Sequence, residues 1–455
     1  MDKIEYRGEW WIPDEASDEW VPEEDAKRTA GVLEFDSDDG GNLDLLGTVT
    51  DIGEPTQKVD TIHGVASNGE FVTLRNCFVG RSSFSAKGTS MRNQQVHVGE
   101  VFSNQLCKAG EPEFQQLRVT YPLLEMWSRI ESVVAKTPPK YDIFGAEIHE
   151  VDPVTAQLDE AEIKISVKNK TKKHNWKGIE LSQTAQITIT PNEVLSFKEY
   201  LNEYIRHIQH FLSLALGEPL NPDTVTGINP SNREEKEKHK TDIAYQVSHL
   251  HEVPDRKHPN KILFSLSDID FEEAIRQWFD SARNAQALHN LYFGTMYNDD
   301  MFEENRFLSL AIAIEGFQSH LFPDHRLMSK DPYDDLHDDI MDTIPDDSPV
   351  RDRIDGLLSS IGHQPSLRNQ ITMVFDQYDD ILPKLINVED VISRTVKNRH
   401  RLAHALEGEF DTTALGNLAQ TLQVVIEAFL MDEIGLESEF IIEKLQKNRK
   451  HLLNG

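Results

Sequence analysis

The stretch Lys261-Ile-Leu-Phe-Ser-Leu-Ser-Asp-Ile-Asp-Phe271 contains the point at which the chain changes from one hydrophobic pattern to another. Before it, short runs of alternating apolar and polar residues stand between turn residues, a pattern typical of β-strands. After it, apolar residues recur at three- and four-residue steps, as on the buried face of a helix. A β-rich half followed by an α-helical half predicts two domains with separate cores. We therefore predict an α+β protein, with a β-rich, sandwich- or barrel-like domain over residues 1–265 and an all-α helical bundle over residues 266–455.

The same patterns predict where individual elements lie. A helix is expected after Pro191, and the segment 217–240, rich in Pro, Asn, Glu and Lys, is expected to be an exposed excursion. The expected strands are residues 31–35, 42–46, 70–74, 95–98, 116–120, 163–167, 185–190 and 261–264. The expected helices are residues 195–212, 271–291, 303–322, 350–362, 367–378, 388–407, 412–434 and 438–453.

The composition limits the classes of function. The 455 residues include 46 Lys+Arg against 78 Asp+Glu, a formal net charge of −32. Such a chain repels phosphate backbones at long range, which argues against a protein that coats DNA or RNA but not against an enzyme with one local basic site. With only Cys77 and Cys107, the sequence has neither a disulfide framework nor a CxxC zinc pair. No signal segment or membrane-spanning run is recognisable, so we expect a cytoplasmic protein that meets no membrane.

The predicted helix over residues 388–407 departs from the pattern of a purely structural helix. Arg399 falls on its apolar stripe, where a guanidinium must be paired or must face a wet cleft or interface. His400 and His404 lie four residues apart and share the adjoining face. An imidazole can take the proton of a ribose 2′-hydroxyl, and an arginine can neutralise the phosphorane charge. This helix therefore carries a candidate site for RNA cleavage without a metal or other cofactor.

The Arg-x4-His spacing alone has little weight, because a chain with 18 His and 46 Lys+Arg contains it about once by chance. In its helical context, Arg399-His-Arg-Leu-Ala-His404 resembles the Arg-polar-x3-His motif of HEPN ribonucleases. The surrounding layout resembles the ApeA-type branch, HEPN proteins of bacterial anti-phage defence. The residue that follows the arginine is most often Asn in that family, and here it is His400. Further segments that resemble the family are residues 8–13 (GEWWIP), 31–35, 121–127 and 271–278.

The resemblance implies a metal-independent endoribonuclease of abortive infection, with two copies of the active site meeting across a homodimer interface. It implies that Arg399 holds phosphate, that His404 acts as general base or acid, and that His400 orients the phosphate or the histidine of the partner. The substrate would be cellular or phage RNA, with tRNA among the candidates. The N-terminal domain would be the sensor or regulator, activated by a phage-derived trigger.

Glu315 and the basic segment 168–177 can each be interpreted either as functional or as purely structural. Glu315 lies on the apolar stripe of the helix expected over residues 303–322, and it either orients Arg399 or forms an unrelated salt bridge or edge contact. The segment 168–177 is the one dense basic stretch. Its residues either contact RNA phosphates and stack on a base, or form a lysine-rich hairpin tip. The residues that would bind RNA in the first case are Lys170, Lys172, Lys173 and Trp176.

Two other classes of protein remain as alternatives. A non-catalytic protein would use HEPN-like helices only to dimerise or to bind a partner. A metal-dependent hydrolase would use the aspartates of residues 334–342, although their spacing fits no known calcium or magnesium loop and favours a solvated acidic loop. Walker A, GxSxG and HExxH motifs are absent, which removes most nucleotide-driven, serine-hydrolase and zinc-protease functions.

Overall fold

The computed structural model divides into two compact units, Met1–Arg276 and Gln277–Gly455. The boundary predicted after residue 265 stays a prediction. The residues that the structure describes are 3–13, 27–50, 57–80, 83–84, 92–107, 111–136, 145–173, 179–229, 240–247, 251, 261–323, 325–361, 364–403 and 411–453.

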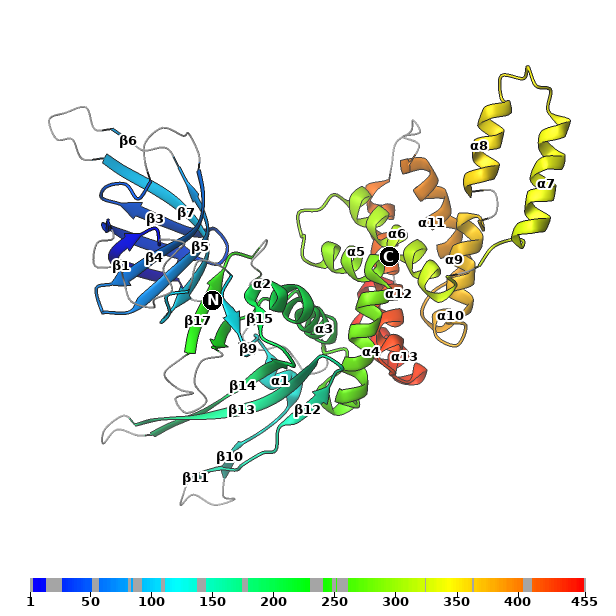
Figure 1. The fold of residues 1–455 in the computed structure, drawn as a ribbon. Helices are drawn as coiled ribbons and strands as arrows, with labels where there is room; N and C mark the ends of the chain where they lie inside the picture. Colours follow the sequence, from blue (N-terminus) through cyan, green and yellow to red (C-terminus); the bar gives the residue numbers. More distant parts are fainter. Residues whose placement is uncertain are drawn as a thin grey trace. The chain divides into compact units, whose positions relative to one another are not determined.

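The first unit contains a closed antiparallel β-barrel, which confirms the prediction of a barrel-like domain (Figure 1). The strands follow the order β7-β3-β2-β1-β4-β5, and β5 then pairs with β7 again, so the sheet closes without a free edge. The barrel strands are β1 (Ile4–Trp11), β2 (Thr29–Asp36), β3 (Gly40–Leu45), β4 (Gln57–Ala66), β5 (Phe71–Val79) and β7 (Arg92–Ser103), and the short β6 (Ser83–Phe84) pairs with β7.

The barrel interior follows from the period-two pattern of its strands. Alternate residues point inward, and side chains such as Trp10, Leu74 and Val98 are fully buried there. Gly64 on β4 faces the ring of Trp10, and a Cβ at this position would lie 2.4 Å from the indole. A larger residue at position 64 would therefore displace the largest side chain of the core.

Strand β7 also belongs to an open sheet. Its residues 94–98 pair with β3, whereas residues 100–103 pair with β17 (Lys240–Tyr245). From β17 the sheet continues through β16 (Thr224–Ile228), β9 (Gln116–Thr120), β14 (Ile179–Pro191), β13 (Ala161–Lys173) and β12 (Val154–Gln157). Two small pairs complete the strands: β8 (Glu113–Phe114) with β15 (Leu195–Ser196), and β10 (Val133–Lys136) with β11 (Gly145–Ile148).

The position of β16 corrects the expectation that residues 217–240 form an exposed excursion. This strand pairs with β9 on one side and β17 on the other, and its Val225 is buried. The strand is short and lies between polar segments, so its hydrophobic pattern did not reveal it.

One long helical segment packs on the open sheet. It consists of α2 (Phe197–Tyr200), the π-helical turn η1 (Leu201–Ile205) and α3 (Arg206–Leu216), and it ends at Gly217 with φ 64°. Aromatic rings join it to α1 (Leu124–Ser128), since Phe211 contacts Trp127. The ring of Phe264 also contacts Phe211, but residues 261–264 form no strand, which corrects that prediction. Residues 262–264 are buried in irregular chain before the 3-10 turn η3 (Leu266–Asp268), and Lys261 is exposed.

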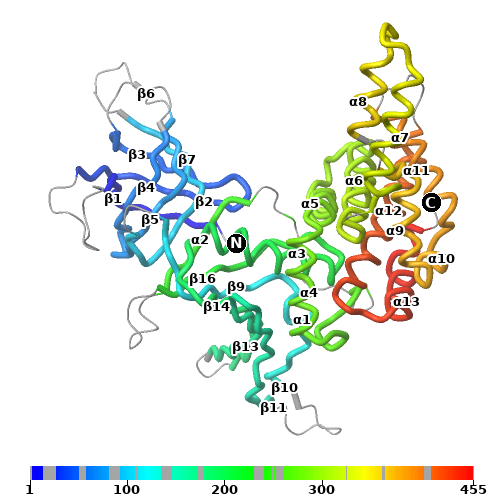
Figure 2. The backbone as a smooth tube through the Cα atoms, turned by 45° about the vertical axis from the view of Figure 1, so that its right-hand side comes forward, coloured from blue at the N-terminus to red at the C-terminus, as the bar shows by residue number. Residues whose placement is uncertain are grey.

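The second unit is all helical, as predicted, with α12 in its middle (Figures 1 and 2), and the unit boundary after Arg276 falls within its first helix, α4. The helix expected over residues 271–291 is broken at Ala285. The break lets the ring of His289 contact Trp278 at a centroid distance of 4.7 Å. The helices are α4 (Phe271–Asn284), α5 (Gln286–Met296), α6 (Glu303–Leu321), α7 (Lys330–Thr343), α8 (Arg351–Ile361), α9 (Leu367–Asp376), α10 (Leu382–Leu385), α11 (Val388–Ala403), α12 (Thr412–Glu433), α13 (Ser438–Asn448) and α14 (Lys450–Leu453).

Among the helices in the described ranges, α12 alone is long and apolar enough to cross a membrane. Most of its apolar stretch, 72%, is buried inside the unit. The core helix of a soluble protein has the same properties, and α12 occupies such a core position.

A buried ion pair joins α12 to the C-terminal helices. Arg449 Nε donates to Glu427 Oε2 at 2.7 Å and its Nη2 donates to Oε1 at 3.0 Å. Tyr292 on α5 donates its hydroxyl to the same Oε1, and burial raises the pKa of this hydroxyl well above its usual range. The carboxylate of Glu427 is completely buried, so the three side chains fix α5, α12 and residue 449 relative to one another.

Replacement of Arg449 with Met should lower the free energy of unfolding of the helical unit by about 3–5 kcal/mol, because it leaves the Glu427 carboxylate buried without a cation. Urea denaturation followed by circular dichroism measures this change. The matched control is Lys330→Met, because Lys330 pairs with Asp334 at 4.0 Å on the surface and should contribute less than about 1 kcal/mol. Equal effects of the two changes would contradict a structural role for the buried pair.

Candidate active site on helix α11

Helix α11 is positioned by its own sequence and by three neighbouring helices. It begins after Asn387, whose side-chain oxygen accepts a hydrogen bond from the Asp390 amide at 3.2 Å. Its inner face carries Val391, Ile392 and Thr395, all buried against α6, α9 and α12. The side chains one turn beyond Thr395 are thereby held at the edge of the core.

Arg399 occupies this edge and is paired with Glu315 of α6. Its Nε donates to Glu315 Oε1 at 3.0 Å, and its Nη2 donates to Oε2 at 3.3 Å. The two side chains are 33% and 20% exposed, so the pair is partly open to solvent. The structure thus brings together the two residues that the sequence placed on separate apolar stripes.

The remaining nitrogen of Arg399 decides what this pair can do. Nη1 forms no hydrogen bond to any residue of the described chain. A carboxylate that holds Nε and Nη2 fixes the plane of the guanidinium and leaves the outer edge free to bind an anion. The arrangement can therefore present an oriented, permanently charged donor to a phosphate.

The two histidines of the motif differ in how far the structure describes them. His400 lies on the last turn of α11 with an exposed side chain. His404 follows the last described residue of the helix and lies outside the described residues.

The outer face of α11 carries further basic residues that the sequence reasoning did not single out. Arg394, Lys397 and Arg401 recur at three- and four-residue steps, and residues 391–406 contain no acidic residue. Lys397 is exposed and forms no ion pair with a described side chain, whereas Arg394 pairs with Asp390. In a chain of net charge −32, these residues form a local positive surface beside Arg399. The absence of acidic residues from positions 391–406 is the feature of the sequence from which this surface could have been predicted.

The other predicted RNA-binding residues belong to the first unit, whereas Arg399 belongs to the second. Lys170 and Lys172 are exposed near the end of β13, opposite Ser182 and Glu180 of β14. Lys173 is the last residue of this strand, and Trp176 lies outside the described residues. A role for these residues in RNA binding stays a prediction.

The aspartates of residues 334–342 belong to helix α7 and not to a loop, which corrects that expectation. On this helix the aspartates recur at three- and four-residue steps, so they line one exposed face and their carboxylates point out into solvent. Within the ranges that the structure describes, no group of three or more His, Cys, Asp or Glu is arranged to hold a metal ion. The acidic segment therefore lends no support to the metal-dependent alternative.

Two family models match the chain. The family described as ApeA N-terminal domain 1 matches residues 5–278, more than half of the sequence, and Apea-like HEPN matches residues 308–440. The chain belongs to the ApeA family. The HEPN match includes Glu315, Arg399 and His404, and it supports a defence protein of the HEPN nuclease type, since HEPN domains are generally ribonucleases. No curated protein and no solved structure gives a significant match to this ApeA-family chain.

The Arg399–Glu315 pair should contribute little to stability, because both side chains are partly exposed. We expect a double-mutant cycle with Arg399→Gln and Glu315→Gln to give a coupling energy of about 1 kcal/mol or less in urea denaturation. A coupling as large as that of a buried pair would mean that Glu315 and Arg399 form a structural ion pair and not a functional one.

Proposed function

We propose that this chain is a metal-independent endoribonuclease of anti-phage defence. The observation that carries the proposal is the arginine on α11, which Glu315 holds through two nitrogens while Nη1 stays available at a partly exposed position. The pair lies inside the segment that matches the Apea-like HEPN family. A geometry that orients a cation without burying it suits the binding of a phosphate group.

In the proposed reaction the RNA supplies its own nucleophile. A neutral imidazole, His404 in our assignment, accepts the proton of the ribose 2′-hydroxyl as the 2′-oxygen attacks the neighbouring phosphorus. The bond from phosphorus to the 5′-oxygen breaks, that oxygen receives a proton from a protonated imidazole, and a 2′,3′-cyclic phosphate remains. Because no water has to be activated, this chemistry requires no metal ion.

Arg399 would bind the phosphate that becomes a phosphorane, whose extra negative charge it neutralises through Nη1. Glu315 would act as a positioning residue, since it touches the guanidinium and not the substrate. His400, exposed on the same turn, would orient the phosphate or the histidine of a second copy in a homodimer. The positive outer face of α11 would hold the RNA on either side of the cleaved bond.

Membership of a defence-protein family supports a proposal for the biological setting. We propose that the N-terminal unit acts as the sensor or regulator and that a phage-derived trigger activates cleavage of cellular or phage RNA in the cytoplasm, which aborts the infection. The acidic charge of the chain outside α11 disfavours indiscriminate binding of cellular RNA.

Purified protein should cleave total tRNA or mRNA in the presence of EDTA and leave ends with a cyclic phosphate. We expect Arg399→Ala and His404→Ala each to lower the rate by about 100-fold or more, because each removes a group that acts in the transition state. The matched controls are Arg353→Ala on α8 and His451→Ala, both exposed and outside α11.

Three outcomes would count against this assignment. Cleavage that EDTA abolishes would favour a metal-dependent enzyme. Equal cleavage by wild type, Arg399→Ala and His404→Ala would mean that other residues act. An absence of cleavage in infected cells as well as in purified protein would favour a non-catalytic protein that uses its helices for dimerisation.

Glu315→Gln should lower kcat by roughly 10- to 100-fold with a smaller change in KM, because a displaced guanidinium stabilises the phosphorane less well. Steady-state cleavage of a short RNA measures both constants. Glu315→Asp keeps the negative charge and should restore part of the loss. Unchanged kcat in a stable Glu315→Gln variant would show that the ion pair does not position Arg399 for the reaction.

A further inference from the structure

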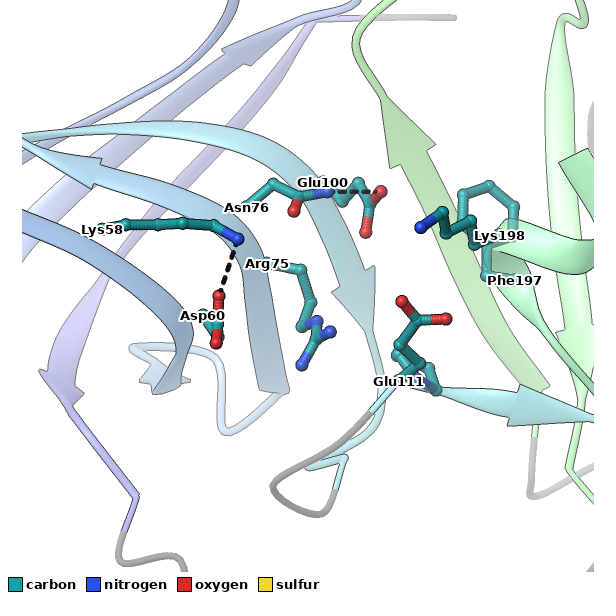
Figure 3. Close-up of a pocket in the computed structure, with 9 residues that line it drawn as sticks. Lys58, Asp60, Arg75, Asn76, Glu100, Glu111, Phe197 and Lys198 are labelled. Atoms are coloured by element: carbon teal, nitrogen blue, oxygen red, sulfur yellow. Dashed lines mark hydrogen bonds and ion pairs between the residues drawn. The ribbon is translucent and has the colours of Figure 1, made fainter.

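A cavity of about 410 Å³ opens in the first unit, where the barrel meets the start of α2 (Figure 3). Strands β4, β5 and β7 form one wall, and residues 111–112 with Phe197 and Lys198 form the other. The volume lies within the range of natural small-molecule sites. None of its lining residues belongs to the proposed nuclease site.

The floor of the cavity is apolar and fixed. Phe197 is buried, and its ring packs edge-on against Phe102 at 5.6 Å and against Tyr245 at 5.4 Å. Pro112 beside it is buried as well. A ligand would therefore find a small preformed apolar surface between the charged side chains.

The barrel wall places a cation and a carboxylate side by side. Arg75 of β5 and Glu100 of β7 are cross-strand partners, and both face the cavity. Asn76 donates to Glu100 Oε1 at 2.8 Å, whereas Oε2 accepts no hydrogen bond from a described residue. Burial raises the pKa of the Glu100 carboxyl, so this carboxylate is incompletely solvated and would be stabilised by a further cation.

Asn76 also shows that the barrel strand is distorted at this point. Its φ of 52° lies in the left-handed region, and it is omitted from the pairing of β5 with both β4 and β7. Residues other than glycine adopt this conformation at an energetic cost, and such positions are frequent at ligand sites. Here the distortion directs the amide of Asn76 to Glu100 at the cavity wall.

The opposite wall carries two further charges, and that of Lys198 offsets part of the rise in the pKa of the Glu100 carboxyl. Lys198 and Glu111 both point into the space in front of Arg75 and Glu100 (Figure 3). Neither forms an ion pair or a side-chain hydrogen bond with a residue of the described chain, although Lys58 and Asp60 at the rim pair with each other at 3.1 Å. A ligand of one sign would meet a repelling charge on each wall, whereas a ligand with both signs would satisfy both walls.

We propose that this cavity binds a small zwitterion of the amino-acid class, with its carboxylate between Lys198 and Arg75 and its ammonium group between Glu111 and Glu100. The site is independent of the proposed nuclease activity, because it belongs to the barrel unit and its binding is measured without RNA.

The test is a thermal-shift screen of the full-length protein with each standard amino acid and with glycylglycine. At least one of these zwitterions should raise Tm, and the rise should grow with ligand concentration. Its N-acetyl and carboxamide derivatives, which each lack one charge, should give no shift. Titration calorimetry should then show affinity reduced by about tenfold or more in Lys198→Met and in Glu111→Gln.

Both variants should fold normally, because Lys198 and Glu111 are exposed and unpaired among the described residues, and their Tm without ligand verifies this. The matched controls are Lys27→Met and Glu193→Gln, exposed residues that do not line the cavity, and both should bind as wild type does. The proposal is overturned if no zwitterion shifts Tm or if both cavity variants keep full affinity. It is also overturned if inorganic phosphate alone gives the same shift, which would indicate a simple anion site.

Discussion

The contact between Arg399 and Glu315 is the interaction on which the proposed active site of the helical unit depends. A guanidinium at a core-facing position of α11 must be compensated, and the compensation comes from α6, 84 residues earlier in the chain. Neither helix alone forms the pair, so the site exists only when α6 and α11 are packed together on α12. A carboxylate that takes two of the three guanidinium nitrogens also determines the direction in which the third can donate. The same interaction thus pairs a guanidinium at the edge of the core and orients its charge.

The second ion pair of the unit shows why partial exposure matters. Glu427 and Arg449 use the same bidentate geometry, yet the carboxylate is completely buried and the arginine is 11% exposed. The Arg449 nitrogens that bind Glu427 therefore stabilise the packing of the helices and are not accessible to a substrate. Arg399 is 33% exposed, and the surface next to it is free of acidic residues from position 391 to position 406. The difference in burial separates an ion pair that holds helices together from one that can meet a phosphate.

Much of this architecture follows from local sequence patterns. The change from period two to helical periodicity predicts a sandwich- or barrel-like first domain and a helical second domain, and the stripe position of Arg399 predicts that it is paired or faces a wet cleft or interface. What the patterns missed depends on contacts between distant segments. The barrel closes through pairing of β5 with β7, and β16 becomes a strand because β9 and β17 lie on either side of it. Hydrophobic periodicity within one segment contains no information on such neighbours.

The pairing of Glu315 with Arg399 illustrates the same limit at the site. From the sequence alone, Glu315 has both a functional and a structural interpretation, because an acidic residue on an apolar stripe is compatible with any nearby cation. Only the packing of α6 against α11 selects Arg399 as its partner. The basic residues of α11 stand in a stretch of sequence without acidic residues, but whether they can meet an anion depends on which side of the helix is exposed. An acid-free window is not enough by itself, since residues 204–217 also lack acidic side chains and are mostly buried. The window on α11 differs because it carries several basic residues and because Lys397 and His400 are exposed beside Arg399.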